Sequence, residues 1–92
     1  MPIDDCENQR ALVEGLAADY RSLEKTTADT EQELARLQAE QAPPETIAAV
    51  QGRLAAEQEQ LGELTVEGQA AVDEFHAVCG GRPLPTPPWP AR

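Results

Sequence analysis

Two cysteines and one histidine are the residues of this chain best suited to covalent or metal chemistry. Cys6 and Cys79 could form a disulfide or pack as two reduced thiols. Asp73 and His76 precede Cys79 at helical spacing, so that all four residues together would offer zinc a carboxylate, an imidazole and two thiolates. Against a metal, no pair of cysteines has the C-x-x-C spacing of ordinary zinc sites, and a histidine in the last turn of a helix is favoured by the helix dipole. We expect no metal or other cofactor, and the state of the cysteines stays open.

Other catalytic patterns do not occur in the sequence. It has no glycine-rich phosphate loop, no nucleophile elbow, no H-E-x-x-H and no second histidine. Adjacent carboxylates occur at Asp4 and Asp5 and at Asp73 and Glu74, where they are typical of a solvated helix face. The 92 residues include only three aromatic side chains, too few for a large core around a pocket. We therefore expect that the protein is not an enzyme.

The charge balance limits the classes of partner. Seventeen acidic and seven basic residues give a formal net charge of -10, which repels phosphate backbones and anionic lipid. We expect no direct nucleic-acid or membrane partner, although spaced carboxylates can also imitate a row of phosphates, which makes an acidic nucleic-acid mimic one alternative. No signal peptide or membrane-spanning run is recognisable. The chain is expected to be soluble, either cytoplasmic or part of a larger assembly.

Helix start and stop signals predict two helices, at about 4–41 and 44–79. Asp4 begins a capping box with the glutamate three residues later. The dipeptide Pro43-Pro44 ends the first helix and begins the second, because proline lacks the N–H of the helical ladder but suits the first position of a helix. Gly80-Gly81 can adopt the left-handed cap that ends the second helix.

A heptad pattern runs through both predicted helices and indicates an all-α, antiparallel two-helix coiled-coil hairpin. Facing residues have numbers that add up to about 85, which places Cys6 beside Cys79 and Leu16 over Gly68. Thr27 and Thr30 interrupt the apolar pattern opposite Glu57, so the middle of the hairpin should be polar. The apolar seam comprises Val13, Leu16, Tyr20, Leu23, Leu34 and Leu37 of the first helix with Ile47, Val50, Leu54, Leu61, Leu64, Phe75 and Val78 of the second.

A second face carries small residues and predicts self-association. They are Ala11, Gly15, Ala18 and Ser22 in the first helix and Ala48, Gly52, Ala55 and Gly62 in the second. Such a face lets another helix approach closely, so we expect a homodimer that forms a four-helix bundle. A two-helix seam alone is marginal, and a disulfide between the cysteines would add stability on the order of 4 kcal/mol.

The chain divides into an acidic hairpin, residues 1–81, and a proline-rich tail, residues 82–92. All acidic residues precede the tail, which contains five of the eight prolines and the single tryptophan. Alternating prolines favour polyproline II, which a partner can order at little entropic cost. The tail is a disordered end, a strap over its own or a neighbouring hairpin with Trp89 covering apolar surface, or a ligand for another protein. The candidate docking residues are Arg82, Pro83, Leu84, Pro85, Pro88 and Trp89.

Three resemblances bear on function. Residues 82–88 resemble the Arg-x-x-Pro-x-x-Pro peptides that SH3 domains bind. Residues 74–81 are similar to the double-glycine leader ending of exported bacterial peptides, which implies release of residues 82–92 by cleavage. Length and shape resemble the WXG type of secreted helical hairpin, but the predicted turn lacks Trp-x-Gly. Our main expectation is a non-enzymatic structural or protein–protein interaction module that binds a protein partner or neighbouring subunit through its tail, such as an adaptor, an assembly protein or a virion accessory protein.

Overall fold

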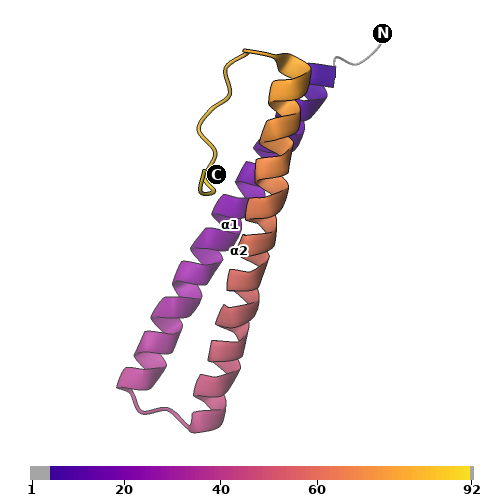
Figure 1. Ribbon diagram of the computed structural model, residues 1–92. Helices are drawn as coiled ribbons and strands as arrows, with labels where there is room; N and C mark the ends of the chain where they lie inside the picture. The colour runs from indigo at the N-terminus through magenta and orange to yellow at the C-terminus, as the bar shows by residue number, and fades with distance from the viewer. Residues whose placement is uncertain (1–4, 92) are drawn as a thin grey trace.

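Two antiparallel helices make up the fold (Figure 1). The computed structural model describes residues 5–91, in which α1 spans Asp5–Ala39 and α2 spans Pro44–Cys79. The described residues contain no strand, which confirms the predicted all-helical fold class. The molecule is elongated, with extents of 59 × 27 × 16 Å. After α2, the chain turns back and runs along one side of the hairpin.

The connection between the helices begins two residues earlier than predicted. α1 ends at Ala39, because Gln41 takes a left-handed backbone conformation with φ 57°. The N–H of Ala42 donates to the carbonyl of Leu37 at 2.9 Å, and the N–H of Gln41 donates to the carbonyl of Gln38 at 3.2 Å. These two hydrogen bonds define a Schellman motif, whose left-handed position is here filled by glutamine instead of the usual glycine.

Proline and glycine set the two ends of α2. Pro44 occupies the start of the helix, as predicted, and the carbonyl of Pro43 accepts hydrogen bonds from the N–H groups of Thr46 and Ile47. At the other end, Gly80 has φ 64° and ψ -132°. This conformation has a positive φ, as expected of the cap, but its ψ lies outside the left-handed helical region, in a part of backbone space that favours glycine strongly. The capping box expected at Asp4 lies outside the described residues.

The main core lies in the half of the hairpin away from the turn between the helices. Phe75 is fully buried there, and Trp89 of the tail belongs to the same cluster. Leu16, Leu61 and Leu64 pack against this cluster and are partly buried. The buried members of the cluster are Cys6, Val13, Ala17, Tyr20, Ala71, Phe75 and Trp89.

The predicted apolar seam positions are buried or half-buried with one exception, Val78, which is 40% exposed. A helix with 3.6 residues per turn drifts by about 20° per heptad against a strict repeat of seven. Over the length of α2 this drift moves the seam, so that Cys79 faces α1 in the last turn instead of Val78. A constant heptad step overlooks such a drift.

The polar layer that the sequence predicted for the middle of the hairpin is present and lies on the turn side of the middle. Thr27, Thr30 and Glu57 are all buried. The hydroxyl of Thr30 donates to Oε2 of Glu57 at 3.1 Å and also lies 3.0 Å from the carbonyl of Thr26, so two acceptors share one hydrogen. Oε1 of Glu57 is buried and has no hydrogen-bond partner within residues 5–91. A polar layer therefore replaces the apolar core here, and one of its buried oxygen atoms makes no hydrogen bond to the described part of the chain.

Candidate docking site for the tail

Residues 82–91, which we call the strap, run in an extended conformation from the end of α2 toward the middle of the hairpin (Figure 1). The regular helix stops at Cys79, and prolines at alternate positions then prevent any return to a helical ladder. The strap runs antiparallel to α2. It places Trp89 beside Gly68, although 21 residues separate them in sequence.

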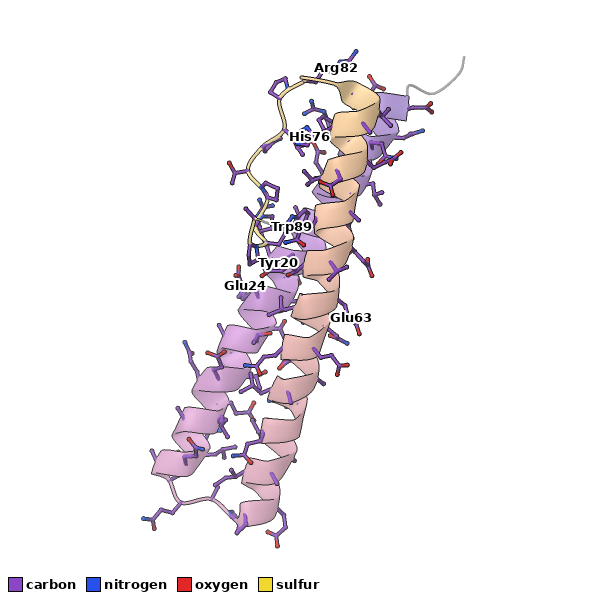
Figure 2. The ribbon with its side chains drawn as sticks, in the orientation of Figure 1. Tyr20, Glu24, Glu63, His76, Arg82 and Trp89 are labelled. Carbon is purple, nitrogen blue, oxygen red and sulfur yellow. A yellow bond between two sulfur atoms is a disulfide. The ribbon has the colours of Figure 1, made fainter. Side chains whose placement is uncertain are left out.

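Trp89 is the main apolar anchor of the strap. Only 5% of its surface is exposed. Its ring meets the ring of Tyr20 edge to face, with centroids 6.1 Å apart and an angle of 75° between the planes (Figure 2). This geometry is one that aromatic pairs prefer. The strap therefore bridges both helices, because Tyr20 belongs to α1 and Gly68 belongs to α2.

Gly68 makes room for the indole ring. A Cβ atom at this position would lie 2.5 Å from Cε2 of Trp89 and 2.6 Å from Cδ2, far inside van der Waals contact. The sequence placed Leu16 over the small residue at position 68 and did not pair Trp89 with it, whereas the three atoms nearest to a Cβ at Gly68 belong to Trp89. The physical reason is that a hairpin of only two helices leaves both of its flanks open. A third segment can therefore fill the notch that Gly68 leaves on one flank.

Two side chains of the hairpin bind carbonyl groups of the strap. The guanidinium of Arg10 donates to the carbonyl of Pro83 at 3.0 Å, and the amide of Gln69 donates to the carbonyl of Pro90 at 2.9 Å. Proline has a carbonyl acceptor but no N–H, so a proline-rich segment is bound most readily by donors. Arg10 also lies over the ring of Phe75, with Cζ 5.5 Å from the ring centroid, which holds the guanidinium in a cation–π contact.

A disulfide between Cys6 and Cys79 ties the helix ends together at the origin of the strap. The two Cα atoms are 5.1 Å apart. Of the states that the sequence left open, the structure shows the disulfide, and the metal alternative loses both of its thiolates. Within residues 5–91 no group of three or more potential ligands could hold a metal ion. His76 is exposed and its ring lies 5.9 Å from that of Phe75, edge to face.

The candidate docking residues of the strap differ in their exposure. Pro83 and Pro85 are exposed, Leu84 and Pro88 are half-buried, and Trp89 is buried. Arg82 is exposed near the last turn of α2 (Figure 2). The strap thus presents one edge to the hairpin and one to solvent. Leu84 packs against the main core, so the apolar contact begins well before Trp89.

Sequence reasoning missed three residues of this site, namely Arg10, Ala17 and Gln69. None of the three belongs to the heptad seam. Arg10 and Gln69 donate hydrogen bonds to the strap, and Ala17 lines the groove beside it. The burial of Ala17 is explained by this cover, since the groove beside the strap is lined by Ala17 together with Val13 and Leu84. The only signal in the sequence was the spacing of Val13, Ala17 and Tyr20 along one side of α1.

Comparisons of the chain with protein-family models, curated proteins and solved structures find no match. Within the described part of the chain, neither helix combines the length and the apolar character that crossing a membrane requires.

Proposed function

We propose that this protein is a non-enzymatic interaction module in which the hairpin is the receptor and the strap is the docking element. The observation that carries this proposal is the burial of Trp89 in the notch at Gly68. A notch formed by a glycine, an aromatic wall and two carbonyl-binding donors recognises an extended, proline-rich segment with a single indole anchor. That chemistry is recognition of a peptide, and it requires no reacting group.

The strap that occupies a receptor can come from the same chain or from a neighbouring subunit. Gly80 and the exposed Gly81 connect the strap to α2, and the receptor lies on the surface of the hairpin. Exchange of identical elements between protomers is a low-cost route to dimers, since it reuses contacts that the single chain already makes. Exchange of the strap between two chains is therefore one way in which the homodimer expected from the sequence could form.

The coiled-coil pairing and the four-helix bundle are further parts of this proposal. The heptad pattern supports the first. The second is supported by the small-residue face, where added Cβ atoms at Gly15, Gly52 and Gly62 would meet nothing within 4 Å. Backbones of a second hairpin could approach closely at these positions. In that assembly each strap would remain free to dock in cis or to a neighbour.

Binding of the strap by another protein, as suggested by the resemblance of residues 82–88 to peptides that SH3 domains bind, is a less favourable mode for the docked chain. A partner that needs Trp89 must first remove it from the notch, at the cost of the contacts with Tyr20 and Gly68. Release of residues 82–92 by cleavage after Gly81 has the same cost. We therefore favour the hairpin of this protein as the receptor.

A complementation experiment tests the proposal. Trp89→Ala leaves an intact receptor without an anchor, and Gly68→Leu leaves an intact anchor without a receptor. We expect that neither variant associates through the strap alone and that an equimolar mixture forms a 1:1 complex in excess of that between either variant and the double variant, measured by native mass spectrometry, which distinguishes the variant chains by mass. The double variant Trp89→Ala/Gly68→Leu is the control, and it should bind neither of the two single variants through the strap. Absence of the mixed complex at concentrations up to about 1 mM, the range of effective concentration for short tethers, would refute the proposal.

A further inference from the structure

A second groove lies between the helices on the flank away from the strap. We call it the back groove. Leu12, Leu16 and Ala71 line its upper part, and Leu23 and Leu64 line its continuation toward the middle of the hairpin. Leu12 is 50% exposed and is one of three large apolar side chains that residues 5–91 leave largely open to solvent.

The charge of the back groove has one sign. All of its charged lining residues are acidic, namely Asp19, Glu63, Glu67 and Glu74. In Figure 2, Glu63 projects from the side of α2 that faces away from Trp89. Of the two grooves beside the strap, one is lined by Arg21 together with Glu14, and the other has Asp73 as its only charged lining residue. Four acidic residues thus line the back groove around its apolar side chains.

We propose that the back groove binds an amphipathic helix of a partner protein whose apolar stripe is flanked by lysine or arginine. The apolar stripe covers the leucines, and the basic flanks meet the carboxylates on both rims. From residue 60 to residue 74 of α2 the groove is about 21 Å long, which corresponds to about four turns of a partner helix. The bound helix completes a three-helix arrangement in this half of the molecule.

Charge disfavours a second copy of this chain as the occupant of the back groove. In a symmetric contact with a second copy, the four acids of one groove would face the four acids of the other, and juxtaposed like charges disfavour association. The strap of the same chain already occupies the opposite flank. A partner with basic flanks is the occupant that neutralises the rims while it covers the floor. This proposal is independent of strap exchange, because the strap stays docked.

The experiment uses the full-length protein and a synthetic amphipathic peptide of about 15 residues. The peptide has leucines at helical spacing, lysines on both flanks and no tryptophan. Its affinity is measured by calorimetry at physiological salt, where attraction between distant charges is screened. We expect saturable 1:1 binding, and we expect that a peptide of the same composition in scrambled order does not bind.

Matched variants locate the binding site. Neutralising three rim acids in Glu63→Gln/Glu67→Gln/Glu74→Gln should weaken binding about tenfold, on the basis of modest contributions from exposed charge pairs. The control Glu31→Gln/Glu45→Gln/Glu59→Gln removes the same charge from exposed positions outside the groove and should change affinity less than about twofold. Leu12→Ser should also weaken binding, whereas Val66→Ser, at a residue 65% exposed outside the groove, should not.

Several results would overturn the proposal. Equal weakening by the two triple variants would show nonspecific attraction to an acidic protein, and equal effects of the two serine substitutions would show that the groove floor is not used. A shift in the emission of Trp89 would place the peptide on the strap side. Absence of saturable binding would reject the site outright. Strap exchange would be unaffected by any of these results, since the complementation pair tests it separately.

Discussion

Replacement of Gly68 by alanine tests how the strap is held. Two effects oppose each other. Alanine in the interior of a helix is favoured over glycine by about 1 kcal/mol. Its Cβ, however, would lie 2.5–2.7 Å from three atoms of the indole, and overpacking of this kind costs about 1–3 kcal/mol. Gly62→Ala in the same helix meets nothing within 4 Å and should give the gain alone. The two variants should differ by about 2 kcal/mol in unfolding free energy, or about 8–16 °C in Tm.

The assay combines thermal unfolding, followed by circular dichroism, with the emission of Trp89, the single tryptophan of the chain. Gly68→Ala should shift this emission toward that of exposed indole, and Gly62→Ala should not. The effect of Gly68→Ala on the unfolding free energy should change from a loss to a gain when the indole ring is absent. In a Trp89→Ala background, Gly68→Ala should therefore stabilise the chain by about 1 kcal/mol. Equal stabilisation by Gly68→Ala and Gly62→Ala, with unchanged Trp89 emission, would refute the placement of the ring in the notch.

Three further predictions concern the rest of the hairpin. Replacing Cys6 and Cys79 together by serine should lower the unfolding free energy by about 2–4 kcal/mol, and reductant should lower that of the native chain equally; denaturant titrations with and without reductant measure this, and identical curves would contradict it. Gln41→Gly should raise Tm through a gain of about 0.5–1 kcal/mol, because glycine adopts positive φ without strain; a lower Tm would count against the cap. Glu57→Leu should stabilise the chain by about 1–2 kcal/mol, because it removes a buried carboxylate oxygen that has no hydrogen-bond partner within residues 5–91, while Thr30 keeps its bond to a backbone carbonyl. Calorimetric unfolding tests this, and a loss of stability would show that the carboxylate of Glu57 is fully hydrogen-bonded.

The sequence was sufficient for the two helices because strong local signals coincide with a long-range pattern. Pro44 determines where α2 begins, and the heptad spacing placed Cys6 and Cys79 at the same end. Both signals arise from backbone geometry, which the sequence encodes directly. The polar layer was also predictable, because Thr30 and Glu57 fall at positions where apolar residues are otherwise expected.

The strap site was less predictable for a physical reason. Contacts between an extended segment and a helix flank follow no fixed period, so Arg10 and Gln69 carried no sequence signal that distinguished them from solvated residues. The size of Gly68 indicated that something large lies against it. A pairing rule based on two helices assigned that role to Leu16, because the rule contains no third segment.

The third segment explains why the core is uneven along the hairpin. Two helices bury only the narrow seam between them. In the half with the turn, no further segment of residues 5–91 covers this seam, which contains the polar layer of Thr30 and Glu57. In the other half, Trp89 and Leu84 add apolar area on one flank, and Ala17 becomes buried as a result. The disulfide fixes the end from which the strap starts. The strap therefore acts as part of the core of this half, which means that any partner able to displace it would also loosen the packing around Phe75.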